Sequence, residues 1–154
     1  MVILHVDDSL AATNLLSEVI LEGDFAATLV SHSDAASALR WLATASPLPD
    51  FVLADLRMPG IDGLAFLRAL AKDERTRAIP SALLTGSDDP RDLERIAAAG
   101  ITRVLRKPQD MASYFELLRQ IGEIASRGGR TRSGRYLAAI APPPLDPPPP
   151  EPAT

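Results

Sequence analysis

Short apolar runs alternate with longer segments of helical periodicity along residues 1–126. Such runs, bounded by polar or turn-forming residues, are typical of strands, and the most uniformly apolar ones are typical of strands covered on both faces. The predicted strands are 2-VILHV-6, 26-ATLV-30, 51-FVLA-54, 81-SALL-84 and 102-TRVL-105.

A helix is predicted after each strand. In Leu10–Leu21 the apolar residues recur on one side, as in an amphipathic helix. An aspartate stands at the expected start of each of the other four helices, and Pro90 directly follows one of them; the four are Asp34, Asp62, Asp89 and Asp110. Five strand–helix pairs predict an α/β fold, a doubly wound five-stranded parallel sheet with helices on both faces.

Chemistry in such a sheet is expected at the carboxyl ends of the strands, near the point where the strand order reverses. Polar residues stand at four of these ends: Asp7-Asp8-Ser9, Asp55, Thr85-Gly86-Ser87 and Lys107-Pro108. Taken singly, each has an ordinary explanation. Asp8 or Ser9 could cap a helix, Asp55 could begin a turn, Thr85 could end a strand and Lys107 could be solvated.

Taken together, the four strand ends predict a reaction site. Three carboxylates at close range repel one another and raise one another's pKa unless a cation lies among them. Oxygen ligands alone favour Mg²⁺. Lys107 offers a positive charge and Thr85 a donor, which suits a small doubly charged anion next to Asp55. A phosphoryl group fits, because its transfer needs a nucleophile, a metal and donors for its oxygens.

Composition excludes several other classes of site. The chain has no cysteine, so disulfides, thiolate catalysis and cysteine-based zinc sites are excluded, and only His5 and His32 could supply imidazole. Residues 1–126 carry 12 basic and 18 acidic side chains, a net charge of −6, which argues against direct nucleic-acid binding. No apolar run approaches a membrane span, and no leader opens the chain, so a cytoplasmic protein is expected.

The motifs VDDS, DLRMPGIDG, LLTGS and LRKP occur in an order and at separations that identify a family. Over residues 1–126 the chain resembles a response-regulator receiver domain of bacterial two-component signalling. The resemblance implies a flavodoxin-like sheet with strand order 2-1-3-4-5. It also implies a phosphoprotein that is not an enzyme beyond Mg²⁺-dependent self-phosphorylation from a donor and autodephosphorylation.

By the same resemblance, Asp55 is the phosphoacceptor, which takes its phosphoryl group from the phosphohistidine of a histidine kinase or phosphotransfer protein. Asp8 would ligate Mg²⁺ directly and Asp7 through water. The backbone carbonyl of Arg57 would supply a further ligand, beside the carboxylate of Asp55. A downstream protein target would then read the phosphorylated state.

Lys107 would pair with the phosphoryl group in the family pattern, and Thr85 would move to hydrogen-bond it. The peptide bond before Pro108 is expected to be cis and to help aim Lys107. Arg57 and Ser87 occupy positions that tune dephosphorylation in the family.

The chain departs from the family pattern at two positions near the lysine. Val104 stands where receivers commonly carry an aromatic ring whose inward turn accompanies the movement of the threonine. Gln109 replaces an apolar residue, whereas the small Gly86 fits the pattern. The chemistry is expected to survive, but the coupling of phosphorylation to conformation would then be weaker or use another element.

The last predicted helix, from about Asp110 to Ser126, has an unusually wide apolar face. Its expected buried stripe is Met111, Tyr114, Phe115, Leu118, Ile121 and Ala125. Leu117 and Ile124 widen this stripe, which fits either a generously packed core helix or a partner surface. The resemblance implies a partner or homodimer surface here, since receivers often use the fourth helix, fifth strand and fifth helix for such contacts.

Residues 127–154 differ in composition from the rest, with four arginines followed by eight of the chain's 14 prolines. They are expected to be a basic, then proline-rich tail or linker without an independent domain. Docking of the prolines on a partner, folding back of YLAAI and a linker to a missing domain are the alternatives.

Two other functions remain open at this stage. One is a receiver-fold docking module that works independently of phosphorylation, which Val104 makes credible. The other is an aspartate-based phosphatase of another α/β family, but such enzymes usually place a second acid two residues after the nucleophile, where Arg57 stands.

Overall fold

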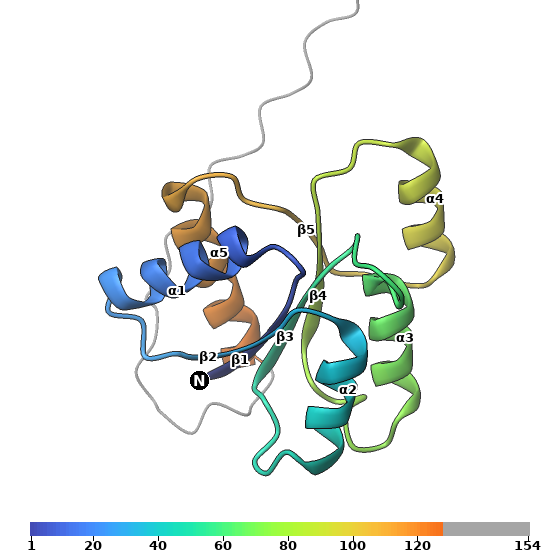
Figure 1. Ribbon diagram of the computed structural model, residues 1–154, viewed down its shortest axis with the longest axis horizontal. Helices are drawn as coiled ribbons and strands as arrows, with labels where there is room; N and C mark the ends of the chain where they lie inside the picture. Colours follow the sequence, from blue (N-terminus) through green and yellow to red (C-terminus); the bar gives the residue numbers. More distant parts are fainter. Residues whose placement is uncertain (128–154) are drawn as a thin grey trace, which may run out of the picture.

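The computed structural model describes residues 1–127, so the expectations for the tail beyond them lie outside the described residues. Its five parallel strands form one sheet in the order β2-β1-β3-β4-β5 (Figure 1). The strands are β1 (Val2–Val6), β2 (Thr28–His32), β3 (Phe51–Asp55), β4 (Ser81–Thr85) and β5 (Val104–Arg106). The predicted fold class and strand order are confirmed.

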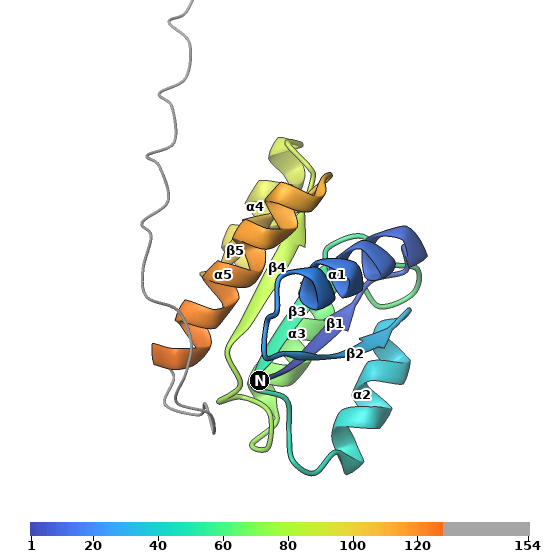
Figure 2. The ribbon, with the colours of Figure 1, turned by 90° about the vertical axis from the view of Figure 1, so that its left-hand side faces the viewer.

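A helix follows each strand, as predicted. The helices are α1 (Leu10–Glu22), α2 (Ala35–Thr44), α3 (Gly63–Lys72), α4 (Pro90–Ala98) and α5 (Met111–Arg127). Helices α1 and α5 pack on one face of the sheet, and α2, α3 and α4 pack on the other (Figures 1 and 2). Within residues 1–127 no helix combines the length and apolar character that crossing a bilayer requires.

Side-chain caps begin the helices at the strand-end loops. Ser9, rather than Asp8, caps α1, with its hydroxyl accepting a hydrogen bond from Ala12 N. Asp34, Asp62 and Asp89 cap α2, α3 and α4 as predicted. These caps satisfy otherwise unpaired amide groups at the same edge of the sheet where the acidic residues lie.

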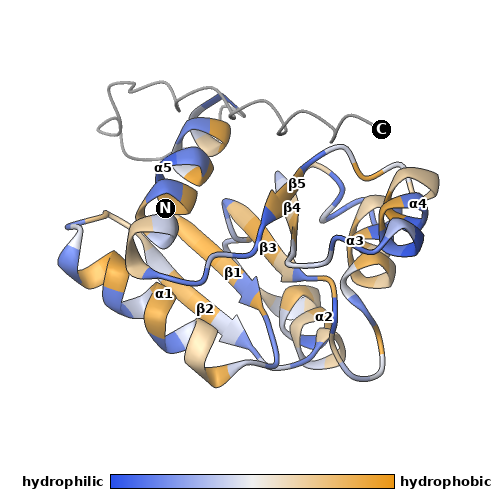
Figure 3. Ribbon diagram, turned by 90° about the horizontal axis from the view of Figure 1, so that it is seen from above, coloured by the Kyte–Doolittle hydropathy of each residue, from blue (hydrophilic) through white to orange (hydrophobic). Residues whose placement is uncertain are grey.

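The sheet separates two apolar cores, because neighbouring residues of each strand point to opposite faces. In β1, Leu4 and Val6 pack with α2 and α3, whereas Ile3 packs with α1 and α5. The central strands are correspondingly apolar in Figure 3. Residues Phe51 to Ala54 of β3 have no exposed area, so β3 is covered on both faces.

Some strand boundaries differ from those predicted. Strand β2 begins at Thr28 rather than at Ala26, and β5 begins at Val104, where pairing with Leu83 of β4 starts. Strands β3 and β4 each continue by one polar residue, because Asp55 pairs with Leu84 and Thr85 pairs with Arg106. Both candidate site residues therefore lie in the sheet itself rather than in the loops that follow.

Helix α5 buries its wide apolar face mainly in the core. Leu117 is as buried as the predicted stripe residues Tyr114 and Leu118. Met111, Phe115 and Ile124 are only partly buried and pack against the edge of this core. The Phe115 ring lies 5.9 Å from that of Phe25. The packing favours the core explanation for Leu117.

Candidate functional site

Three carboxylates converge where the strand order reverses, between β1 and β3. Asp7 and Asp8 follow β1 and Asp55 ends β3, and one oxygen from each lies within 4.8 Å of the others. Asp7 and Asp55 are buried, with 2% and 5% exposed area, whereas Asp8 is exposed. Two buried acids beside a solvent-facing one form an oxygen-lined site that fits a hard divalent cation.

Lys107 supplies the positive charge of this site. Its Nζ lies 2.9 Å from Asp7 Oδ2 and 3.3 Å from Asp55 Oδ1. Its backbone N–H donates to Thr85 O over 2.9 Å, which continues the β4–β5 pairing by one residue. Lys107 is therefore held at its backbone by the sheet and at its ammonium group by two acids.

The expected cis bond before Pro108 is wrong. Among residues 1–127 the cis peptide bond is Ser46–Pro47, and the bond before Pro108 has the trans form that most proline bonds adopt. The backbone hydrogen bond of Lys107 to Thr85 holds the lysine in this geometry.

Two pKa values of the site are raised, with opposite consequences for charge: the shift favours the neutral form of Asp55 and the charged form of Lys107. Burial, together with the charge of Asp7, raises the pKa of Asp55 to about 6, although Lys107 opposes the shift. Burial alone would lower the pKa of Lys107, but the hydrogen bond and charge of Asp7, and then Asp55, raise it. Lys107 thus stays charged, while Asp55 carries a costly charge that a cation would relieve.

Thr85 and its loop form the other wall of the site. Thr85 Oγ1 accepts a hydrogen bond from Ser87 N over 3.0 Å. Asp55, Thr85, Gly86, Ser87 and Lys107 line a cavity of about 300 Å³, together with Leu56 and Arg57. A side chain at Gly86 would meet no atom within 4 Å, so this part of the β4–α4 loop is uncrowded.

Comparison with known proteins identifies the family. The model of the response regulator receiver domain matches residues 3–119, most of the chain. The chain belongs to the receiver-domain family. These domains are the phosphoacceptors of two-component signalling and bind Mg²⁺ or Mn²⁺ at an acidic pocket.

The relatives agree with this assignment. The chain is 32% identical over 143 residues to the response regulator PleD of Caulobacter vibrioides, covering 90% of this chain and 31% of PleD. It thus spans about a third of the length of that relative. The receiver domain of a signal transduction histidine kinase from Syntrophus aciditrophicus superposes with a TM-score of 0.71 at 28% identity, covering 90% of this chain and 98% of that one. The Mn²⁺-bound form of response regulator Rcp1 gives 0.66 at 27% identity, covering 79% and 91%.

Two polar residues of predicted buried elements, His5 of β1 and Tyr114 of α5, lie behind the acidic pocket of this receiver domain, and this position was not predicted from the sequence. His5 has no exposed area, and its Nε2 lies 3.7 Å from Asp7 Oδ2 while its Nδ1 lies 3.4 Å from Thr13 Oγ1. The hydroxyl of Tyr114 is buried without a hydrogen-bond partner among the described residues. The sequence shows only that a histidine and a tyrosine stand within otherwise apolar stretches. The packing of α5 against the sheet brings these two residues behind the acidic pocket.

We expect His5 to remain neutral far below the usual histidine range. Burial lowers its pKa to about 4, against the opposing charge of Asp7 and with some help from Lys107. A protonated His5 would carry a desolvated charge. The imidazole resonances of His5 in EDTA should therefore show no titration between pH 7 and pH 5. An NMR titration, with resonances assigned from a His5→Gln variant, measures this. A midpoint near 6.5 would contradict the burial of His5.

Proposed function

We propose that this receiver domain takes a phosphoryl group from a phosphohistidine of a histidine kinase or phosphotransfer protein onto Asp55, with Mg²⁺ as the cation. The observation that carries the proposal is the position of Asp55. Its carboxylate is buried at the end of β3, within 4.8 Å of oxygens of Asp7 and Asp8 and 3.3 Å from Lys107 Nζ. A buried carboxylate amid other acids is costly, and a reactive role accounts for it.

In the proposed reaction a carboxylate oxygen of Asp55 forms a bond to phosphorus as the phosphorus–nitrogen bond of the donor breaks. The imidazole leaves with the electron pair and the product on Asp55 is an acyl phosphate. Lys107 Nζ would exchange its contact with Asp55 for one with a phosphoryl oxygen, and Thr85 would turn its hydroxyl toward another. Loss of the phosphoryl group to water returns Asp55, and no other reaction is proposed.

The cation would be held by Asp7, Asp8, Asp55 and the backbone carbonyl of Arg57. A divalent cation neutralises charge on the transferring phosphoryl group and on the acids around it. The donors are all oxygen atoms, which suits Mg²⁺. The Mn²⁺-bound form of the similar regulator Rcp1 supports a divalent cation, and the choice of Mg²⁺ rests on the donor set.

The signal is proposed to pass through protein contacts. Residues 1–126 would act as the receiver unit and 127–154 as a tail or linker, in a cytoplasmic protein that contacts neither membrane nor nucleic acid. The proposed surface for a downstream target or a homodimer is the face formed by α4, β5 and α5. Leu93 of α4 and Val104 of β5 support it, because they expose 51% and 37% of their area.

A docking module that ignores phosphorylation is the second candidate. Val104 favours it, because a partly exposed valine has no ring that could move between solvent and core. The two candidates differ in whether binding of the target changes once Asp55 carries a phosphoryl group.

Incubation of the full chain with a small phosphodonor and Mg²⁺ should add the mass of one phosphoryl group. Intact-mass spectrometry measures the adduct, and EDTA should prevent it because the acids around Asp55 then repel the donor. Protein that binds Mg²⁺ and is folded, yet forms no adduct, would contradict the proposed function and favour the docking module.

A further inference from the structure

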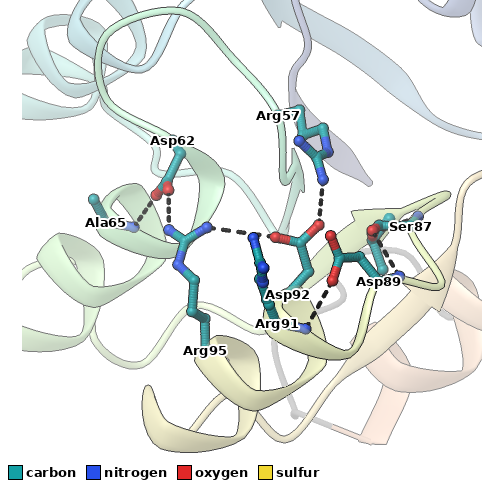
Figure 4. Close-up of polar contacts among 9 residues, drawn as sticks. Arg57, Asp62, Ala65, Ser87, Asp89, Arg91, Asp92 and Arg95 are labelled. Carbon is teal, nitrogen blue, oxygen red and sulfur yellow. Dashed lines mark hydrogen bonds and ion pairs between the residues drawn. The ribbon is translucent and has the colours of Figure 1, made fainter.

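A chain of alternating charges connects the loop after Asp55 to helix α4 (Figure 4). Arg57, two residues after Asp55, donates from Nη2 to Asp92 Oδ2 of α4 over 2.5 Å. Arg95 of α4 lies 3.6 Å from Asp92 Oδ1 through Nη1 and donates from Nη2 to Asp62 Oδ2 over 2.6 Å. Asp62 is also the N-cap of α3. The two helices and the β3–α3 loop are thus joined by three ion pairs.

Asp92 is the centre of this chain. It is 7% exposed, in a helix whose other charged residues are exposed. A hydrogen bond from the Ser87 side chain lowers the pKa of Asp92, and the neighbouring charges of Arg57 and Arg95 lower it further. Asp92 therefore keeps its charge and offers a buried acceptor to both arginines, whose own side chains are 69% and 54% exposed.

The contacts of Asp92 reach both loops that border the reaction site. Arg57 belongs to the β3–α3 loop, and its backbone carbonyl is a proposed cation ligand. Ser87 belongs to the β4–α4 loop, where its backbone N–H donates to Thr85 Oγ1. A groove beside Asp8 is lined by Arg57, Asp92 and Arg95. Asp92 has no part in the proposed chemistry, but it contacts Arg57 and Ser87, which flank the reaction site.

We propose that Asp92 is a positioning residue for the cation site: by holding the side chain of Arg57 it keeps the β3–α3 loop, and with it the Arg57 carbonyl, in place for a divalent cation. The inference rests on the proposed function for the identity of that carbonyl ligand. Partners that orient the ligands of a metal ion commonly affect its affinity as much as tenfold or more. This contact is one step more remote, so a smaller loss is expected.

Asp92→Asn should weaken Mg²⁺ binding about three- to tenfold, as measured by calorimetry on the full chain without phosphodonor. Arg57→Gln should weaken Mg²⁺ binding as well. The double variant should bind Mg²⁺ no more weakly than the single variant with the lower affinity, because both changes break the same Arg57–Asp92 ion pair. Electrostatics alone predicts the opposite for Arg57→Gln, since removal of a positive charge near the acids would strengthen cation binding.

Glu94→Gln is the matched control. Glu94 is an exposed acid of the same helix, and among residues 1–127 it forms no ion pair with Arg57 or Arg95. The affinity of Glu94→Gln for Mg²⁺ should lie within about twofold of that of the unmodified chain. Thermal unfolding in EDTA tests whether each variant is folded, and Asp92→Glu, which keeps the charge, should recover part of the affinity if Asp92→Asn proves unstable.

Phosphorylation should show the same effect in its cation dependence. Asp92→Asn should form the adduct more slowly at low Mg²⁺ and reach the rate of the unmodified chain at saturating Mg²⁺. Unchanged Mg²⁺ affinity in Asp92→Asn, or tighter binding in Arg57→Gln, would overturn the inference while leaving phosphorylation of Asp55 intact. If Asp92→Asn and Arg57→Gln weaken Mg²⁺ binding as predicted, but the unmodified chain forms no adduct, the proposed function alone is overturned.

Discussion

Asp55→Asn abolishes the phosphoryl adduct and, in EDTA at neutral pH, yields a more stable folded protein than the unmodified chain. The adduct is lost because an amide is not a nucleophile toward phosphorus. The gain in stability arises because burial and the charge of Asp7 raise the pKa of Asp55 to about 6. Keeping Asp55 ionised in the metal-free fold therefore costs free energy, on the order of 1–3 kcal/mol. Asparagine carries no such charge, and Lys107 retains Asp7 as its partner.

The sign of the pH dependence follows from the direction of this shift. The folded chain binds a proton at Asp55 more tightly than the unfolded chain, whose carboxyl has the ordinary value of 3.8. The stability of the unmodified chain therefore rises as the pH falls from about 6 toward 3.8, as far as Asp55 is concerned. The advantage of Asp55→Asn should be full above pH 6 and vanish near pH 4. His5 affects both proteins alike, so it cancels in the difference.

Urea unfolding in EDTA at several pH values measures this difference. Glu18→Gln, at an exposed position of α1, is a control for the loss of one negative charge. Saturating Mg²⁺ should reverse the order, because the unmodified chain binds the cation more tightly and gains more from it. A metal-free Asp55→Asn variant that is no more stable at pH 7.5, or whose advantage persists at pH 4, would contradict the described electrostatics of the pocket.

Local patterns in the sequence predicted the features that depend on neighbouring residues. Apolar runs located the strands, and the aspartate caps at Asp34, Asp62 and Asp89 located three helix starts. The strand ends also predicted that Asp55 and Lys107 would meet, because parallel strands bring their carboxyl ends to one edge of the sheet.

Side-chain contacts that lie away from the strand ends and join distant segments were not predicted. The Arg57–Asp92 ion pair joins residues 35 positions apart, and nothing in either segment marks the other as its partner. The histidine at position 5 acquires its significance from Asp7 and from the helices that bury it. Strand ends shifted by one or two residues for a similar reason, since the partner strand decides where pairing begins and stops.

Gly63, the last residue of the DLRMPGIDG motif and the first of α3, lies where the fold leaves no space for a side chain. Gly63 N donates to Leu56 O over 3.0 Å, which brings the first turn of α3 against the end of β3. A Cβ at Gly63 would lie 2.2 Å from the backbone oxygen of Asp55 and 2.8 Å from Leu83 Cδ1. Real Cβ atoms do not approach other atoms so closely, and the first contact is with backbone that cannot rotate away.

Gly63→Ala should therefore lower the free energy of unfolding by about 2–4 kcal/mol, since either α3 or the end of β3 must move. Gly86→Ala is the control, because a Cβ there meets no atom within 4 Å and the residue has no left-handed φ; it should stay within about 0.5 kcal/mol of the unmodified chain. Urea unfolding measures both. Because the displaced atom is the carbonyl of Asp55, folded Gly63→Ala should also form the phosphoryl adduct more slowly. A stable Gly63→Ala variant with normal phosphorylation would mean that α3 can retreat from β3 without disturbing Asp55, and that the close approach has no part in holding the carboxylate.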